Sequence, residues 1–355
     1  MARHKPRLVF NLHPRVFGGT ESFFLRLAVA LRKDFAPVFI SPRLGPALSR
    51  AASFGFETAL VREGRGSARK LLQIAPSLLQ SNYYLPFMAM AGKELGVPHV
   101  WRVGGHPDLV LAHLSAPDRE AFLKMMSLLS DKIICASRFI ARPFAAAGLE
   151  DAAVINNGVS LPSRALPAFR EGNPFKIAMV AHLHPQKRHE DFIRAAGELL
   201  RGPRMYEFVI FGNALADQRT YAAGLKKMAR ELGAGGKIKI RAFSGDASAA
   251  LADCHAFALP AENEGASNAI LEAMALGLPA VVARSGGNAE LVAHRKTGLI
   301  IPAREPRALV AAIEVLASNP GLRLRIGQAA REAAKRSFSI EASAARYARL
   351  YASLL

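Results

Sequence analysis

Cysteine, acidic residues and long apolar runs are all scarce in this sequence. Its only cysteines, Cys135 and Cys254, lie in apolar, strand-like surroundings, which excludes a disulfide-bonded secreted scaffold. No run of about 18 uninterrupted apolar residues is present, so we expect no membrane-spanning helix. The apolar run at 8–12, after a basic start, is too short for the core of a signal peptide and favours a first strand. We therefore expect a cytoplasmic protein.

The shortage of acidic residues leaves a formal net charge of +19, which is shared between both halves of the chain. A positive electrostatic potential around the protein favours anionic partners such as nucleic acid, an anionic membrane surface or a phosphorylated ligand. The sequence has no zinc-knuckle, RRM or helix-turn-helix pattern, so we expect no nucleic-acid partner. A solvated basic surface without a specific partner is the alternative.

Short β-like apolar runs alternate with helical patterns along the chain, for example strands at 99–103, 256–259 and 280–283 and a helix at 86–95. This alternation predicts parallel sheets covered by helices on both faces. It breaks at 160–174, where prolines and a glycine among polar residues indicate a linker. Because 355 residues exceed the usual size of one domain, we expect two α/β domains with a cleft between them.

The strongest local signal lies at 264–279. Ser267 is a favoured N-cap, strong helix formers follow it, and a glycine and a proline mark the end of the predicted helix. Glu264 before the helix and Glu272 inside it are placed to reach different parts of one ligand. The free N–H groups of 266–268 and the helix dipole would face a phosphate, while carboxylates would accept hydrogen bonds from sugar hydroxyls. A helix with one capping and one exposed glutamate explains the spacing equally well.

Together with its surroundings, this segment resembles the Glu-x7-Glu element of retaining GT-B glycosyltransferases of family 4, or glycosyl transferases group 1. Further segments resemble motifs of that family and follow in the family's order: Phe17–Glu21, Ile155–Val159, Ala181–His189, Val209–Gly212, Ser285–Glu290 and Thr297–Leu299. No single segment is specific, but their common order is.

The resemblance implies a GT-B fold with an N-terminal Rossmann-like acceptor-side domain at 1–165 and a C-terminal nucleotide-sugar-binding domain at 166–335. Apolar residues spaced along one helix face indicate a last helix within 336–355. In the family such a helix packs back on the N-terminal domain. A simple terminal helix on the second domain is the alternative.

The resemblance also assigns roles by position. Glu264 would contact hydroxyls of the transferred sugar, Glu272 would bind the ribose, and Lys187 would neutralise the diphosphate. Gly18 and Gly19 would let the backbone approach the phosphates, although a plain turn explains them as well. The remaining positions expected to contact the donor are His182, Gly212, Gly265, Ala266, Ser267 and Asn268.

Position 182 departs from the family, which usually has arginine there. Histidine supplies neither a permanent charge nor a bidentate fork to a phosphate. Weaker donor binding, compensation by Arg188 or loss of catalysis are the alternatives that follow.

An Asp-x-Asp motif is also absent, so we expect no metal ion and no cofactor. Lys187 and the predicted helix N-terminus would then stabilise the leaving group.

His106 ends the segment 99–106, at the edge of a parallel sheet where ligands bind. The family often has a histidine at this strand end, so we expect His106 near the donor sugar and, with Glu264 and Lys187, among the catalytic residues. A loop histidine of no role is the alternative. Arg65, Arg69 and Lys70 precede an apolar stretch and indicate contact with an anionic membrane surface. A solvated helix start fits these three residues as well.

The expected function is that of a retaining, metal-independent glycosyltransferase. It would move a sugar from a nucleotide-diphosphate sugar to a cell-envelope glycan or lipid-linked acceptor, in lipopolysaccharide or exopolysaccharide biosynthesis. We expect it in the cytoplasm, with a peripheral position on the inner face of the cytoplasmic membrane as a further expectation. A non-catalytic nucleotide-sugar-binding relative, motivated by His182, and a sugar-nucleotide epimerase are the alternatives.

Overall fold

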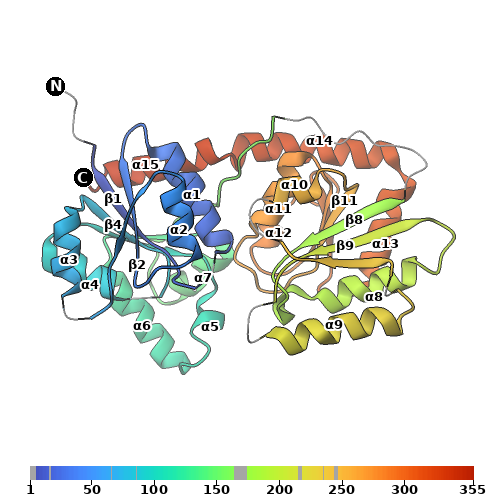
Figure 1. Cartoon of the computed structure of the whole chain (residues 1–355), viewed down its shortest axis with the longest axis horizontal. Coiled ribbons are helices and arrows are strands. Elements are labelled where there is room, and N and C mark those ends of the chain that lie inside the picture. The colour runs from blue at the N-terminus through green and yellow to red at the C-terminus, as the bar shows by residue number, and fades with distance from the viewer. Residues whose placement is uncertain are drawn as a thin grey trace. The chain divides into compact units, whose positions relative to one another are not determined.

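The computed structural model describes residues 5–15, 17–64, 66–84, 86–163, 174–214, 218–234, 236–243 and 247–355. The chain divides into two compact units (Figure 1): unit 1 is Met1–Gly158 with Ile340–Leu355, and unit 2 is Val159–Ser339. The first boundary between the two units, after Gly158, therefore lies before the domain boundary predicted between residues 165 and 166. The N–H of Val159 donates to the carbonyl of Phe338 over 2.8 Å, and Val159 pairs with Ser339 as a parallel bridge, so these segments join unit 2 together. Most of the predicted linker, 164–173, lies outside the described residues.

Unit 1 is built on a parallel sheet with strand order β3-β2-β1-β4-β5-β6-β7. Its strands are apolar over short lengths and almost fully buried in the centre, as expected for a sheet covered on both faces. The strands are β1 (Arg7–Asn11), β2 (Ala36–Ser41), β3 (Glu57–Leu60), β4 (Leu78–Ser81), β5 (His99–Val103), β6 (Lys132–Cys135) and β7 (Ala153–Val154).

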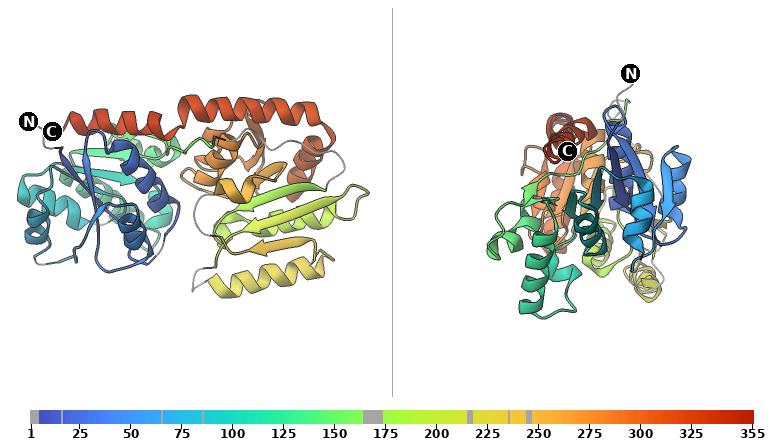
Figure 2. Two further views of the ribbon diagram at one scale, coloured as in Figure 1. Left: turned by 45° about the horizontal axis from the view of Figure 1, so that its top comes forward. Right: turned by 90° about the vertical axis from the view of Figure 1, so that its left-hand side faces the viewer.

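Helices cover both faces of this sheet (Figure 2). They are α1 (Gly19–Leu31), α2 (Pro46–Ser53), α3 (Ser67–Ile74), α4 (Pro86–Leu95), α5 (Pro107–Val110), α6 (Ala116–Leu129), α7 (Arg138–Ala146) and α15 (Ile340–Ala352). Successive residues of β1 point to opposite faces: Leu8 and Phe10 pack with α1, α2 and α15, whereas Val9 packs with α3 and α4. The last helix of the chain, α15, thus belongs to the core of unit 1, and its buried Tyr351 donates a hydrogen bond to Gln80.

Unit 2 repeats the design with a parallel sheet of order β10-β9-β8-β11-β12-β13 and one continuous apolar core. Its strands are β8 (Phe175–Val180), β9 (Tyr206–Phe211), β10 (Ile238–Arg241), β11 (Ala256–Leu259), β12 (Ala280–Ala283) and β13 (Gly298–Ile301). Its helices are α8 (His189–Leu199), α9 (Arg219–Glu231), α10 (Ala247–Leu251), α11 (Asn268–Leu276), α12 (Asn288–Leu291), α13 (Pro306–Ser318) and α14 (Pro320–Ser337), with a 3₁₀ turn, η1, at Pro185–Lys187.

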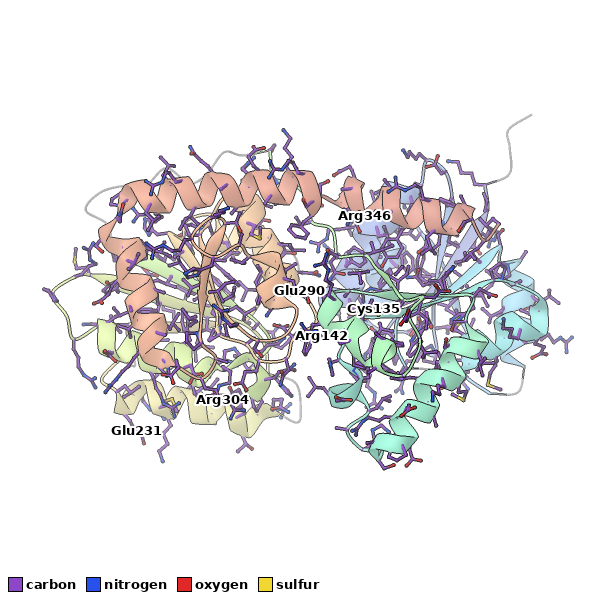
Figure 3. All side chains as sticks on the ribbon, turned by 180° about the vertical axis from the view of Figure 1, so that it is seen from behind. Cys135, Arg142, Glu231, Glu290, Arg304 and Arg346 are labelled. Carbon is purple, nitrogen blue, oxygen red and sulfur yellow. The ribbon has the colours of Figure 1, made fainter. Side chains whose placement is uncertain are left out.

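Both units are therefore Rossmann-like, as expected from the sequence. The two cysteines are buried and free, Cys135 at the end of β6 (Figure 3) and Cys254 in unit 2. Within the described part of the chain, none of the helices combines the length and the apolar character needed to span a lipid bilayer.

Candidate functional site

The loops that follow β8 and β11 meet at the point where the winding of the unit 2 sheet reverses. The two strands are neighbours in the sheet, where Ala256 of β11 pairs with Ile177 of β8, although they lie far apart in the sequence. Ligands of open α/β sheets bind outside the carboxyl ends of the strands at such a point. His182 and Lys187 follow β8, and Glu264 follows β11, so the topology brings these three predicted site residues to one place.

Backbone and amide hydrogen bonds hold the loops after β8, β11 and β12 together. The N–H of Glu262 donates to the carbonyl of Gln186 over 2.9 Å, and the side chain of Gln186 donates to the carbonyl of Asn263 over 3.1 Å. The N–H of Asn263 donates in turn to the Ser285 hydroxyl over 2.9 Å. At the edge of this cluster the guanidinium of Arg304 (Figure 3) binds Glu262 through two hydrogen bonds, which lower the pKa of that carboxyl. The loops thus form one preorganised surface.

Glu264 and Lys187 form an ion pair at the centre of this surface, through Oε1 of the carboxylate and Nζ of the lysine. Their side chains are 16% and 17% exposed, so both charges are largely removed from water yet accessible. The other carboxylate oxygen, Oε2, accepts a hydrogen bond from Nδ2 of Asn288 over 3.1 Å. The two predicted catalytic residues of unit 2 are therefore in direct contact.

Helix α11 begins at this surface, with Ser267 in the predicted N-cap position. The Ser267 side chain makes no capping hydrogen bond, however. The backbone N–H of Ser267 donates to Oδ1 of Asn288 over 2.9 Å. The prediction that the amides of 266–268 are all free was therefore wrong at Ser267. Asn288, on the first turn of α12, takes that amide instead. Gly265, Ala266 and Asn268 flank this position at the start of α11, as the sequence placed them.

His182 lies half-buried directly after β8. Burial, followed by the positive charge of Lys187, lowers the pKa of its imidazole below the ordinary value, and a hydrogen bond with the backbone of Asn213 acts in the opposite direction. The suggested compensation by Arg188 is not supported, because the Arg188 guanidinium is engaged by Asp191 through Nε at 2.9 Å and Nη2 at 3.1 Å. At position 182, where the resembled family usually has arginine, this surface thus carries an imidazole of lowered pKa beside the paired Lys187.

Glu272 is buried, with only 5% of its surface exposed. One of its oxygens accepts a hydrogen bond from the N–H of Ala247, the first residue of α10, over 3.2 Å. Gly212 directly follows β9, and a Cβ at this position would lie 2.0 Å from the carbonyl oxygen of Ala181. Both residues therefore have structural roles that hold without a ligand, in addition to the donor contacts predicted for them.

The remaining predicted site residues belong to unit 1. Gly18 is the N-cap of α1, with its N–H bonded to the Glu21 carboxylate over 2.9 Å, and Gly19 opens the helix. Glu21 itself is buried, accepts a hydrogen bond from the Tyr83 hydroxyl, and has a pKa raised by burial. The double glycine thus starts a tightly capped helix, and a role at phosphates stays a prediction.

His106 precedes the short helix α5 and packs on the ring of Phe139, with 4.5 Å between the ring centroids. Burial lowers the pKa of its imidazole, although Asp108, with 3.8 Å between Nδ1 and Oδ2, acts in the opposite direction.

Of the three basic residues predicted to meet a membrane, Arg69 and Lys70 are exposed on α3, and Arg65 lies outside the described residues.

Sequence reasoning missed Asn288. It lay inside the segment that resembles a family motif, but only the fold brings its side chain to Glu264 and Ser267. Among the described residues, no three or more histidine, cysteine, aspartate or glutamate side chains form a group that could hold a metal ion.

Comparison with known families identifies the chain. Residues 167–333 match the family described as Glycosyl transferases group 1, and residues 17–162 match the one described as Glycosyltransferase Family 4. The chain belongs to the group 1 glycosyltransferases. The order of the motifs from Phe17 to Leu299 is thereby explained.

Relatives of this glycosyltransferase include an uncharacterized glycosyltransferase, MJ1178, of Methanocaldococcus jannaschii, which is 26% identical over 73% of this chain and 70% of its own length. The lipopolysaccharide core biosynthesis mannosyltransferase LpcC of Rhizobium leguminosarum is 29% identical over 50% of this chain and 51% of its own length. The chain thus spans about half the length of some curated relatives that it matches.

Among solved structures, Alr3699/HepE of Anabaena in complex with UDP superposes with a TM-score of 0.84 over 98% of this chain and 100% of its own, at 21% identity. The same Anabaena protein has also been solved with UDP-glucose. At this identity the likeness establishes the fold, which is GT-B with two Rossmann-like domains.

Proposed function

We propose that this glycosyltransferase transfers a sugar from a nucleotide-diphosphate sugar to a cell-envelope glycan or lipid-linked acceptor, with retention at the anomeric carbon and without a metal ion. The observation that carries the proposal is the accessible Glu264–Lys187 pair beside the start of α11, at the carboxyl ends of β8 and β11. The Anabaena protein solved with UDP and UDP-glucose supports a nucleotide sugar as the donor. The relatives named for lipopolysaccharide core biosynthesis support the acceptor class.

The residues of unit 2 divide the chemistry between the leaving group and the sugar. Lys187 and the first turn of α11 face the developing negative charge of the departing diphosphate, which is electrostatic stabilisation of the leaving group. Glu264 accepts hydrogen bonds from sugar hydroxyls and orients the ring. The bond between the anomeric carbon and the diphosphate oxygen breaks, the acceptor oxygen bonds to the same face, and its proton passes to the released diphosphate.

Lys187 is therefore shared between two partners. In the free protein its charge is paired with Glu264. When the diphosphate is present, the lysine interacts with both anions, because an ammonium group has three donors and lies on a flexible stem. This pairing compensates the charge of the largely buried lysine before the donor arrives.

Slow hydrolysis of the donor tests this proposal without knowledge of the acceptor. Purified protein is incubated with a panel of UDP-, GDP- and ADP-sugars, and release of the nucleotide is measured. We expect hydrolysis of one donor by the wild type and its loss in Glu264→Ala and Lys187→Ala. An exposed charge pair on unit 2, Lys227 with Glu231, supplies the matched control Lys227→Ala, which should hydrolyse the donor as the wild type does.

His182 supports a second candidate function, a nucleotide-sugar-binding protein without catalysis. Its lowered pKa leaves the phosphate region with less positive charge than the family arginine would supply. Binding of a nucleotide sugar without hydrolysis or transfer to any acceptor would favour this second function over the first.

A peripheral position at an anionic membrane is a further part of the proposal, supported by exposed Arg69 and Lys70 on α3 and by the net charge of +19. Sedimentation with vesicles of phosphatidylcholine and phosphatidylglycerol tests it. Removal of the charges at Arg65, Arg69 and Lys70 should reduce the bound fraction. Equal sedimentation of this variant and the wild type would reject this patch.

A further inference from the structure

Asn288 is buried completely and uses both ends of its side-chain amide. Its Oδ1 accepts the hydrogen bond from the Ser267 N–H over 2.9 Å, and its Nδ2 donates to Oε2 of Glu264 over 3.1 Å. Only this orientation of the amide satisfies both neighbours, because reversal would set two donors against each other and two acceptors against each other. The bonding network therefore fixes the direction of the amide.

The Glu264 carboxylate is consequently held from two sides. Lys187 contacts Oε1 from the 3₁₀ turn η1, and Asn288 contacts Oε2 from α12. The backbone of Glu264 is fixed as well, since its carbonyl accepts the N–H of Gly287 over 2.7 Å. Gly286, with φ +63°, lies so close that a Cβ there would be 2.4 Å from the same carbonyl oxygen. Of these contacts, the lysine is the flexible one, and Asn288 is rigid because it is buried and doubly bonded.

We infer that Asn288 is a positioning residue that locks the Glu264 carboxylate to the first turn of α11, so that the group that meets the sugar and the helix end that meets the diphosphate keep a fixed spacing. The importance of that spacing for catalysis rests on the proposed function. The lock itself follows from the two hydrogen bonds and can be tested without any donor.

Asparagine is the side chain that fits both neighbours. It offers one acceptor and one donor at the ends of a short, planar group, whereas aspartate at neutral pH offers acceptors only. Asn288→Asp therefore keeps a partner for the Ser267 N–H but sets a second carboxylate against Glu264. Glu264→Gln supplies the complementary change, because a glutamine at that position can donate to an aspartate at 288.

A reciprocal exchange of the two groups tests the lock through stability. We expect Asn288→Asp to lower the thermal midpoint of unfolding by about 4 °C or more. The double variant Asn288→Asp with Glu264→Gln restores the donor–acceptor pair with reversed polarity and keeps the net charge of the wild type. It should recover at least half of that loss. The inference would be overturned if the change in the midpoint of the double variant equalled the sum of the changes in the two single variants.

The kinetics of donor hydrolysis test whether the lock serves catalysis. We expect Asn288→Asp to lower kcat about tenfold or more while KM for the donor changes much less, because the carboxylate loses its orientation but the nucleotide contacts remain. Gln328→Glu is the matched control, since it makes the same amide-to-carboxylate change at an exposed position of α14 and should change kcat less than about twofold. Wild-type kcat in Asn288→Asp would refute the positioning role.

The double variant separates the two hypotheses further. It should be folded and stable yet inactive, because it lacks the carboxylate at 264. If the wild type hydrolyses no donor of the panel, the proposed function fails, while the stability cycle still decides whether Asn288 holds Glu264.

Discussion

Replacement of His182 by arginine should strengthen diphosphate binding and remove its dependence on pH. His182 is half-buried after β8, beside Lys187 and Glu264, and burial followed by the charge of Lys187 lowers the pKa of its imidazole. The free wild-type protein therefore holds a neutral imidazole at pH 7 and above. His182→Arg places a permanent charge at the position where the family has one.

The size of the effect follows from the bonds that the guanidinium would make. A hydrogen bond to a charged group contributes about 1.5–3 kcal/mol, which corresponds to roughly 10- to 150-fold in affinity. Two features of the site favour the lower limit. Lys187 already supplies a positive charge, and that charge also lies near the new guanidinium and disfavours it. We therefore expect about tenfold tighter binding of the nucleoside diphosphate by His182→Arg at about pH 8.

The dependence on pH has a definite sign. An anionic diphosphate favours the protonated imidazole, so binding by the wild type strengthens as the pH falls through the histidine range and weakens as it rises. Arginine is charged throughout, so the advantage of His182→Arg is largest at about pH 8 and shrinks toward about pH 5.5. The phosphate titration of the free ligand is common to both measurements and cancels in their ratio.

Isothermal titration calorimetry with UDP, GDP and ADP at both pH values measures this ratio. His113→Arg, an exposed change in unit 1, adds the same net charge far from these contacts in sequence and should leave the affinity unchanged. The reasoning is refuted if His182→Arg binds no tighter than the wild type at the higher pH, or if the ratio of the two affinities is the same at both.

Three further predictions concern stability and binding. Gly212→Ala should lower stability by about 1–3 kcal/mol, measured by urea denaturation, because its Cβ would lie 2.0 Å from the Ala181 carbonyl oxygen. Glu272→Ala should cost about 1–3 kcal/mol by leaving the buried Ala247 N–H without this acceptor, whereas Glu272→Gln should retain stability but bind the donor more weakly in calorimetry. Tyr351→Phe should lower the thermal midpoint of unit 1 by removing a buried hydrogen bond worth about 1 kcal/mol.

Local patterns predicted the elements that position the site. Strands β5, β11 and β12 and helix α4 have the ends expected from their apolar runs and flanking residues. These segments are buried on both sides or amphipathic, so composition and periodicity carry the signal. Helix α14, Pro320–Ser337, was not predicted from the sequence. Its inner face contains Gly327, where a Cβ would lie 2.1 Å from the carbonyl oxygen of Gly277, so the close packing depends on the lack of a side chain.

The contacts of the candidate site were beyond prediction from local sequence. Asn288 meets Ser267 and Glu264 across more than twenty positions, and their hydrogen bonds exist because β11 and β12 are adjacent in the sheet. Arg188 and Asp191 illustrate the opposite case, since a pair three residues apart at a helix start was open to prediction from spacing. Glu264 and Ser267 were predicted from the sequence, but their shared partner Asn288 was not, because only the strand order brings it to them.

The Glu264–Lys187 pair argues for a ligand more strongly than it argues for stability. Removal of two charges from water costs free energy that their attraction offsets only when the remaining donors and acceptors are satisfied. Here the Glu264 carboxylate has a second partner in Asn288. The side chains of Glu264 and Lys187 are 16% and 17% exposed, so a ligand can still reach them. A stability role would favour apolar side chains at these positions, whereas a diphosphate and a sugar need one cation and one acceptor at the edge of the sheet. The arrangement therefore fits the proposed role of the pair at a nucleotide-sugar donor better than a role in stability.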